Sequence, residues 1–365
     1  MSADGTTFAY GYGADRDWRN AAAACLDMLD ENLPPEGVGF IYLSDYFAPV
    51  ARDILTVLRG RTGIDHWVGA AGIGISAGRQ QIFDTPALAA MVAGWPRDRF
   101  AVLDGPDAAP PAFDPWFGIL HGNPQTPDLP EAIADFADRI GGYWVGGLAA
   151  SRGPHPMIAR GISDAAVSGV VLSPEIEVAT SLSQGCTPIG PEHEITKAED
   201  NVIIELDGRN AFEVFAEEIG DILARNLNRV PGFIFAGLPV AGADTADYLV
   251  RDIVGLDPQY GAVGIGAEAV VGSRIMFCRR DGATATEDMG AMLERLEKRL
   301  GGKTPKAGLY YSCLGRGPNM FEDSRTELDM IAERFGDLPL TGFFCNGEIS
   351  NARLYTYTGV LSLFL

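Results

Sequence analysis

The chain has 365 residues, 47% of them hydrophobic, and its 49 acidic and 28 basic side chains give a formal net charge of -21. The hydrophobic content suffices for one or two sizeable cores. The net charge is strongly negative and the sequence contains no cluster of Lys or Arg, so nucleic acid and anionic membrane surfaces are excluded as general partners. No apolar run reaches the length of a membrane span, and the N-terminus lacks the pattern of a signal peptide. We therefore expect a cytoplasmic protein.

Cysteine and histidine usage argues against a metal cluster. The five cysteines are odd in number, far apart and without a CxxC pair, so we expect them to be reduced. The histidines contain no pair at the spacing of a helical metal site. These residues are Cys25, Cys186, Cys278, Cys313 and Cys345, and His66, His121, His155 and His193.

The N-terminal part alternates between helices and strands. Apolar spacing predicts a helix over 15–33, which Pro34-Pro35 ends. A continuous apolar strand is expected at 38–43, then an amphipathic helix over 47–58. A long strand that contains several glycines is expected over 66–75. Shorter strands follow at 81–83, 88–92 and 100–103.

This order of elements recurs twice. The second copy has a strand, a helix, a strand with glycines and two further strands, at 117–121, 130–140, 143–148, 157–159 and 167–172. The third has the same elements at 308–313, 325–335 and 342–347, with a last strand pair at 354–357 and 360–364. Strand-helix-strand crossovers are parallel, and hairpins are antiparallel. The sequence thus predicts an α/β (α+β) fold with internally duplicated strand-helix-strand-hairpin units and mixed sheets flanked by helices.

Other elements lie between the second and third copies. A turn-rich segment at 184–191 precedes a strand at 202–206 and a helix from Asn210. Strands are expected within 232–277, and Thr284 with Glu287 forms a capping box that opens a helix to Leu300. We expect a domain boundary between 190 and 210, which divides the chain into domains 1–200 and 201–365.

Glycines occur at matched places in the three glycine-bearing strands. They are Gly69 and Gly72, Gly146 and Gly147, and Gly342 and Gly347. Such glycines mark close approach of another strand or of a ligand. Tight packing explains most of them in our interpretation. The glycine-bearing strands of the first half are also candidates to close a binding site formed by the third copy.

The loop after the strand at 308–313 is the first candidate for a binding site. It contains Cys313, Gly315, Arg316 and Gly317, and a helix follows whose start is marked by a capping box of Ser324 and Glu327. Free backbone N–H groups, the helix dipole and the Arg316 guanidinium all favour an anion there. A purely structural loop is the alternative.

The strand that follows this helix supplies the second half of the candidate site. Glu348 could receive a ligand's ammonium group while Arg316 binds its carboxylate, which would define an amino-acid site. A mutual ion pair or a solvated turn residue is the alternative for Glu348. The predicted ligand-binding residues are Cys313, Gly315, Arg316, Gly317, Gly342, Phe344, Cys345, Gly347 and Glu348.

Four segments together resemble the FIST family, whose members carry FIST N-terminal and C-terminal domains. These segments are 183–191, 202–211, 312–317 and 339–349, and the resemblance covers about 35–365. It implies a sensory module that binds a small-molecule ligand, usually proposed to be an amino acid or a related metabolite. This sequence carries no recognisable output segment, so the signal would pass to a signalling protein in trans.

Two other functional classes stay open. Some similar proteins sense nitric oxide through haem, and His121 and His155 are the first candidate ligands because both flank glycine-rich turns. A cysteine-dependent enzyme would use Cys313, whose thiolate the helix N-terminus and Arg316 would favour. No histidine lies near Cys313 in sequence to act as a base. We favour a non-enzymatic sensor without a cofactor, as a monomer or a dimer.

Overall fold

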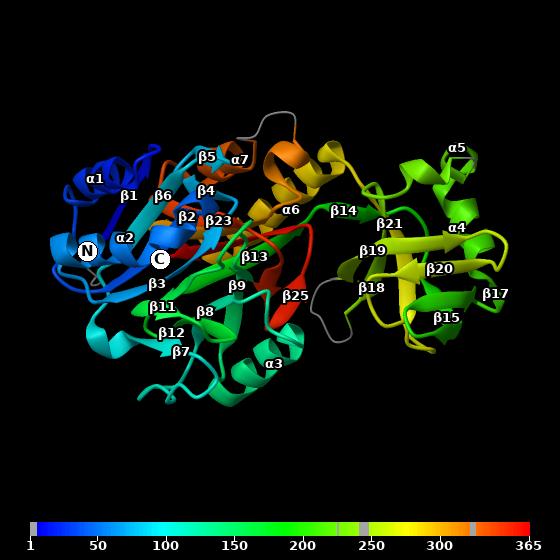
Figure 1. The fold of residues 1–365 in the computed structure, drawn as a ribbon, viewed down its shortest axis with the longest axis horizontal. Coiled ribbons are helices and arrows are strands. Elements are labelled where there is room, and N and C mark those ends of the chain that lie inside the picture. Colours follow the sequence, from blue (N-terminus) through cyan, green and yellow to red (C-terminus); the bar gives the residue numbers. More distant parts are fainter. Residues whose placement is uncertain (1–5, 225, 241–247, 322–325) are drawn as a thin grey trace. The chain divides into compact units, whose positions relative to one another are not determined.

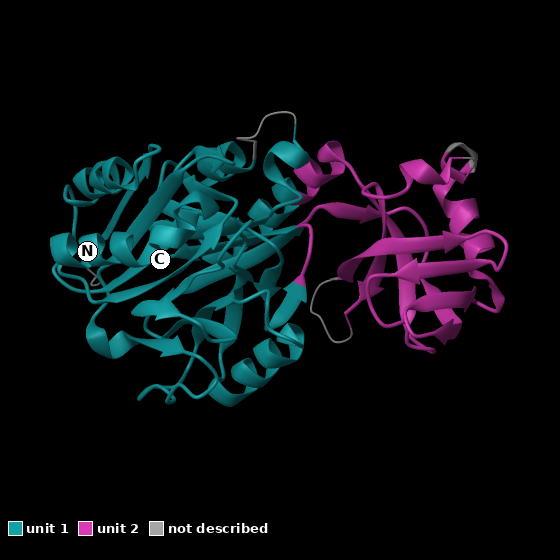
Figure 2. Cartoon of the chain, viewed as in Figure 1, with its two compact units in different colours: residues 1–183, 289–354, 358–365 teal, residues 184–288, 355–357 magenta. Residues whose placement is uncertain are grey.

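Figure 1 shows the chain as a computed structural model, which describes residues 6–224, 226–240, 248–321 and 326–365. The chain forms two compact units (Figure 2). The first comprises 1–183, 289–354 and 358–365, and the second comprises 184–288 and 355–357. The boundary expected near residue 200 falls inside the second unit, so the compact units differ from the two sequence domains expected above.

The first unit contains three copies of one arrangement of elements, as the sequence predicted. The first copy is β1 (Phe8–Ala14), α1 (Trp18–Leu29), β2 (Val38–Ser44), α2 (Ala51–Thr62), β3 (His66–Gly72), β4 (Gly74–Ala77), β5 (Gln80–Phe83) and β6 (Ala87–Ala93). The second is β7 (Phe100–Asp104), β8 (Phe117–Gly122), α3 (Leu129–Ile140), β9 (Tyr143–Leu148), β10 (Met157–Ala159), β11 (Gly161–Ser163) and β12 (Val167–Leu172). The third is β13 (Val178–Gln184), α6 (Gly282–Leu300), β22 (Ala307–Cys313), α7 (Thr326–Phe335), β23 (Leu340–Cys345), β24 (Glu348–Ser350), β25 (Arg353–Tyr355) and β26 (Thr358–Phe364). Of these elements, the end of β13, the start of α6 and the end of β25 are counted with the second unit.

Three six-stranded sheets repeat the same strand order. They run β1-β6-β2-β3-β10-β11, β7-β12-β8-β9-β24-β25 and β13-β26-β22-β23-β4-β5. In each sheet the two strands that flank the crossover helix, β2–β3, β8–β9 or β22–β23, are parallel neighbours. The strand on the other side of β2, β8 or β22 is antiparallel to it, so all three sheets are mixed.

The hairpin that ends each parallel pair joins the sheet of a different repeat. The β4–β5 hairpin of the first repeat pairs with β23 of the third, and β24–β25 of the third pairs with β9 of the second. The β10–β11 hairpin of the second repeat pairs with β3 of the first, which closes the cycle. Each sheet therefore needs strands from two repeats.

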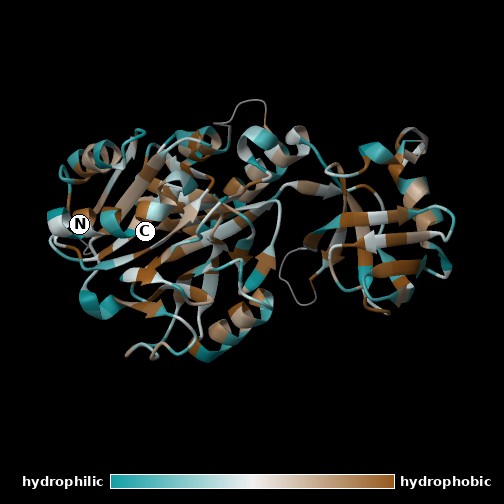
Figure 3. Ribbon diagram, viewed as in Figure 1, coloured by the Kyte–Doolittle hydropathy of each residue, from teal (hydrophilic) through white to brown (hydrophobic). Residues whose placement is uncertain are grey.

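Alternation along the strands builds one shared core and three outer ones. On β2, Phe40 and Tyr42 face a core that also contains Ile119 of the second repeat and Leu309 of the third. Residues of opposite parity, such as Ile41, pack under the helices on the outer face. Because both sheet faces are buried, these strands are continuously apolar. The covering helices, such as α3 and α6, carry both hydrophilic and hydrophobic residues (Figure 3).

Three element predictions were wrong in detail. The strand expected over 66–75 is two strands, because the chain leaves β3 at Ile73 and begins β4 in another sheet. The last expected strand pair is also divided, since β25 and β26 lie in different sheets. Helix α6 begins before Thr284, because the Asp281 carboxylate accepts the Thr284 N–H at 2.9 Å. Ser324 of the second capping box lies outside the described residues.

The second unit is an antiparallel barrel. Strand β18 (Ile234–Pro239) pairs with both β19 (Tyr248–Asp257) and β21 (Arg274–Arg280), which closes the strand order β21-β15-β16-β20-β19-β18. Helix α4 (Ala211–Ile219) contributes to its core. The other elements are β14 (Cys186–Pro188), β15 (His193–Glu199), β16 (Val202–Leu206), β17 (Arg209–Asn210), α5 (Asp221–Ala224) and β20 (Ala262–Ile265). Short 3-10 turns are η1 (Asp45–Val50), η2 (Arg97–Arg99), η3 (Leu227–Arg229) and η4 (Gly317–Asn319).

No helix among the described residues combines the length and the apolar character that crossing a membrane requires.

Three matched glycines let the parallel strands approach each other. A Cβ atom on Gly69, Gly146 or Gly342 would lie 1.7, 1.8 or 1.7 Å from the carbonyl oxygen of the residue opposite it on the partner strand. No side chain fits at such distances. Strand packing therefore explains these three glycines.

We expect Gly342→Ala to destabilise the protein by about 3 kcal/mol or more, because the new methyl group must displace strand β22. The control is Gly60→Ala in helix α2, where a Cβ meets no atom within 4 Å. For Gly60→Ala we expect the free energy of unfolding to rise by about 0.5–1 kcal/mol, because alanine has the higher helix propensity. Urea unfolding followed by circular dichroism measures the stability of both variants, and equal effects would contradict the packing argument.

Candidate functional site

The candidate site lies where two parallel strands of the third repeat end. β22 and β23 both end in a cysteine, and Cys313 is directly opposite Cys345. The chain continues from Cys313 into the loop that holds Gly315 and Arg316, and from Cys345 through Gly347 into β24. The carboxyl ends of parallel strands are where α/β proteins usually bind ligands.

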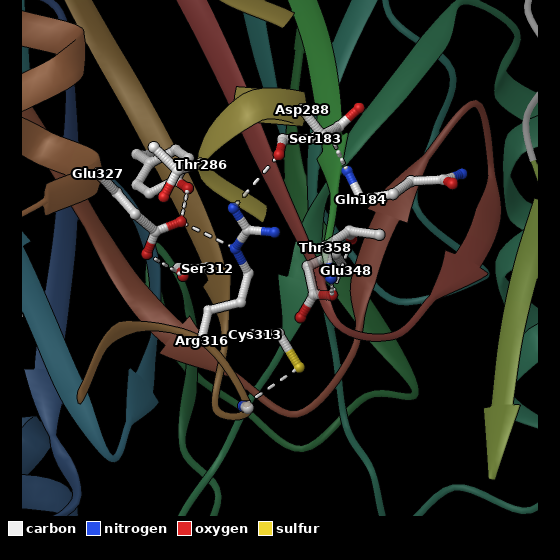
Figure 4. Close-up of polar contacts among 12 residues, drawn as sticks. Ser183, Gln184, Thr286, Asp288, Ser312, Cys313, Arg316, Glu327, Glu348 and Thr358 are labelled. Atoms are coloured by element: carbon white, nitrogen blue, oxygen red, sulfur yellow. Dashed lines mark hydrogen bonds and ion pairs between the residues drawn. The ribbon is translucent and has the colours of Figure 1, made fainter. Parts of the chain in front are cut away.

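Five of the predicted residues come together here, and three of them, Cys313, Arg316 and Glu348, are labelled in Figure 4. The Cys345 thiol donates a hydrogen bond to Glu348 Oε1 at 3.3 Å, and Arg316 and Glu348 interact electrostatically. Cys313 lies in register with Cys345, and the Gly315 N–H donates to its sulfur at 3.5 Å. The structure therefore gathers three ionisable residue types in one buried place.

The remaining predicted residues have packing roles. Gly342 lies within the strand pair, against the Tyr310 carbonyl. Gly317 has φ of 54°, and its Cα lies against the Phe344 ring, since a Cβ there would be 2.7 Å from Cε1. Phe344 in turn makes an edge contact with Phe83 at 5.0 Å between centroids. Gly347 has φ of 126°, which favours glycine at the turn into β24.

Arg316 forms an ion pair with Glu327 inside the protein. Nε of Arg316 lies 2.8 Å from Oε1 of Glu327, and neither side chain is exposed. The Arg316 Nη2 group donates to Ser183 Oγ at 3.2 Å. The guanidinium that the sequence assigned to a ligand anion is therefore already close to a carboxylate of the protein.

Glu327 joins several groups besides Arg316. Its Oε1 accepts the Tyr310 hydroxyl at 2.5 Å, and its Oε2 accepts the Ser312 hydroxyl at 3.3 Å. Sequence reasoning treated Glu327 as a capping residue and missed this role. The signal that it could have used is an acidic residue in the first turn of the helix that follows an Arg-containing loop.

Glu348 is a buried carboxyl held by three hydrogen bonds. Its Oε2 accepts both the N–H and the hydroxyl of Thr358, at 3.0 and 2.8 Å, and its Oε1 accepts the Cys345 thiol. Burial raises the pKa of Glu348 to about 7, although these bonds and the Arg316 charge act in the opposite direction. Thr358 was not predicted, because nothing in the sequence links β26 to β24.

The other repeats show what the fold requires at these positions. Glu348 is opposite Gly147, Ile75 is opposite Phe343 and Met157 is opposite Ala70, and each partner directly follows a matched glycine. Ile75 and Met157 both belong to the shared core. The scaffold thus accepts an apolar residue at this position twice, so it does not need a carboxyl group there.

A polar cluster in the shared core joins the three repeats. Tyr42, His121 and Tyr311 directly follow the residues opposite the matched glycines. The two tyrosine hydroxyls lie 2.9 Å apart, and His121 Nε2 lies 3.3 Å from the Tyr42 hydroxyl. Burial lowers the pKa of His121 to about 3, so the imidazole is neutral at neutral pH.

Haem does not fit at His121 as it is packed. The rings of Tyr42, Phe343 and Tyr311 lie 5.6, 5.9 and 6.3 Å from the imidazole, which leaves no open face for a porphyrin. His155 is half-buried between β9 and β10. Within the described residues, no group of three His, Cys, Asp or Glu side chains is arranged to hold a metal ion.

Comparison with known proteins supports the resemblance seen in the sequence. Models of the FIST N domain and the FIST C domain match residues 37–209 and 211–351. The chain is 30% identical over 349 residues to the uncharacterized protein MT0656 of Mycobacterium tuberculosis, which covers 86% of this chain and 88% of that protein. An alignment of 389 positions, gaps included, makes the chain 29% identical to the uncharacterized protein Mb0898c of Mycobacterium bovis. This alignment covers 96% of this chain and 96% of that protein.

We expect Arg316→Met to destabilise the protein by about 3–5 kcal/mol, because it leaves the Glu327 carboxylate buried without its cation. The double variant Arg316→Met/Glu327→Gln should recover a large part of this loss. The surface pair of Arg334 and Glu297, 2.8 Å apart and 33% and 55% exposed, is the control. Arg334→Met should cost less than about 1 kcal/mol by urea unfolding. Equal costs would contradict a buried ion pair.

Glu348 should make stability fall as pH rises. Because its pKa is raised from 4.5 to about 7, the native state holds a proton that the unfolded chain loses in this window. The free energy of unfolding of Glu348→Gln should therefore rise relative to that of wild type, by up to about 3 kcal/mol, as the pH goes from 4.5 to 8. Urea titrations across this range test the sign, and parallel pH profiles of the two proteins would refute it.

Proposed function

Because the chain belongs to the FIST family, whose domains are associated with sensory signal transduction and small-ligand binding, we propose that it is a non-catalytic sensor of an amino acid or a related small anionic metabolite. The proposed ligand site is the junction of β22, β23 and β24. We place the protein in the cytoplasm, and five cysteines without disulfides support a reducing compartment.

The observation that carries this proposal is the difference between the repeats. The parallel pair of the first repeat ends in Ser44 and Gly72, whereas that of the third ends in Cys313 and Cys345. Glu348 likewise stands where the other repeats have apolar residues. Buried ionisable groups that the scaffold does not require indicate a functional site.

The ligand would be held by opposite charges at its two ends. Ionised Glu348 would bind an ammonium group, and Arg316 would bind a carboxylate in competition with Glu327. A ligand that separates Arg316 from Glu327 would act directly on α7, because Glu327 lies in the first turn of that helix. Leu328 and Ile331 of α7 pack in the core under this sheet. Such a shift, driven by the ligand's preference for one state, could be read by a signalling partner in trans.

A thermal-shift screen with amino acids and small organic anions tests the proposal. A ligand at 100 times its dissociation constant should stabilise the native state by about 2.7 kcal/mol. The decisive variant is Glu348→Ile, which installs the side chain that the first repeat carries at this position. We expect it to fold and to lose the shift for an amino acid.

The matched control is Asp98→Asn, which removes a carboxylate whose side chain is 78% exposed. It should keep the full ligand-induced shift. Equal shifts for wild type and Glu348→Ile would exclude Glu348 as the ammonium site. No shift with any compound for a folded, colourless wild-type protein would argue against the proposed ligand class, and a red protein with a Soret band would favour haem.

A further inference from the structure

We propose that Cys313, Cys345 and Glu348 form an oxidisable dithiol site that reacts with small hydroperoxides, with Glu348 as the proton acceptor. This inference goes beyond ligand sensing and does not depend on it, because disulfide formation requires no ligand. The two proposals are measured separately, so either can fail while the other stands.

The two cysteines are placed to form a disulfide. They face each other across neighbouring strands, whose backbones lie about 4.8 Å apart, within the range of about 4.4–6.8 Å that disulfides span. Both are on the same sheet face as Tyr311 and Phe343, which precede them by two residues. The Cys345 thiol also reaches toward β22, since its sulfur lies 3.4 Å from the carbonyl oxygen of Ser312, the neighbour of Cys313.

Glu348 is placed to accept the proton of Cys345. The thiol donates to Glu348 Oε1 at 3.3 Å, and Thr358 holds the other carboxyl oxygen. Burial and the nearby Glu348 charge raise the pKa of Cys345, so this thiol needs a base to become nucleophilic. Gly147 provides the space for this thiol, because a Cβ there would lie 2.7 Å from the Cys345 sulfur.

Cys313 is the sulfur that an oxidant reaches first. It is 6% exposed, whereas Cys345 is fully buried, which restricts access to small oxidants. The backbone N–H of Gly315 donates to its sulfur, a hydrogen bond that a thiolate accepts better than a thiol. Cys313 also ends its strand, so the glycine-containing loop after it can adjust as a bond forms.

The reaction has two steps. The Cys313 thiolate attacks one oxygen of the hydroperoxide, the O–O bond breaks, and the alkoxide or hydroxide that leaves takes a proton from solvent. The Cys345 sulfur then attacks the Cys313 sulfenic acid as its proton moves to Glu348. The S–S bond forms, the S–O bond breaks, and the leaving hydroxide takes up this proton from Glu348 and departs as water. Two thiols are oxidised by two electrons, the peroxide is reduced to alcohol and water, and an external thiol reductant restores the dithiol.

The cysteines are not explained by packing alone. At the position of Cys345 the first and second repeats carry Gly72 and Ala149, and at that of Cys313 they carry Ser44 and Asn123. The scaffold therefore folds around other small residues at both places. Only the third repeat combines both thiols with a carboxyl group.

The test treats the full-length protein with hydrogen peroxide, followed by thiol counting and peptide mass spectrometry. We expect the loss of two thiols and one linked peptide that contains Cys313 and Cys345. The internal control is the buried pair of Cys186 and Cys278, which lie on the paired strands β14 and β21 but two residues out of register. These two should stay reduced. A Cys186–Cys278 bond that forms equally fast, or the absence of a Cys313–Cys345 bond, would overturn the proposal.

Two variants test the roles within the site. Cys345→Ala carries the residue of the second repeat, so it should fold, and Cys313 should then accumulate as a sulfenic acid that dimedone traps. Glu348→Gln should slow the formation of the disulfide from the Cys313 sulfenic acid by at least about tenfold, and it should leave the first oxidation of Cys313 unchanged. In the wild-type protein the rate of this second step should rise with pH as Glu348 ionises, and the variant should lack this rise.

The groups that can titrate or carry charge around Glu348 are Cys345 on β23, Arg316 in the loop and Cys313 on β22, while Thr358 on β26 and Gly147 on β9 carry none. The Glu348→Gln variant keeps all of these groups and lacks only the Glu348 carboxyl group. The same pH profile in wild type and variant would therefore remove Glu348 from the mechanism. An unchanged rate in Glu348→Gln would do the same.

Discussion

The exchange of hairpins between the three repeats is the constraint on which the first unit depends. A single repeat cannot complete a sheet, since its parallel pair lacks the strands that another repeat supplies. The exchange therefore couples residues far apart in sequence into one core, in which Tyr42, His121 and Tyr311 meet. It also places β24 beside β9, and this pairing buries Glu348 against Gly147. Without the exchange, Glu348 would be an ordinary residue after a turn.

The repeats serve as internal controls for function. All three use the same glycine to bring their parallel strands together, so that feature belongs to the scaffold. Cys313, Cys345 and Glu348 have no ionisable counterpart in the other two repeats. Differences between copies of one scaffold separate what a site does from what the fold needs, without reference to any other protein.

The buried charges of the third repeat depend on one another. In a low-dielectric interior, Arg316 is stabilised by Glu327, and Glu327 by Tyr310 and Ser312 as well. The hydrogen bonds that the described residues make to Glu348 come from neutral donors, and burial raises the pKa of its carboxyl group to about 7, so that this group is poised between its two protonation states at neutral pH. A change at either acid, through a ligand or through the oxidation of a neighbouring thiol, would alter the balance of charge in the whole cluster. This explains how one compact region could serve both proposals.

The sequence by itself determined the three copies of strand, helix and strand, the parallel pairs and the FIST family, because apolar periodicity, glycine punctuation and short motifs are local signals. It also placed Cys313, Cys345, Glu348 and Arg316 in one region, since all four lie at the ends of two strands that had to be neighbours or just after them. Only the tertiary structure decided that the hairpins change sheets, that Arg316 pairs with Glu327, and that Thr358 binds Glu348. These contacts depend on which strands become neighbours across repeats, and strand pairing between distant segments leaves no local pattern in the chain.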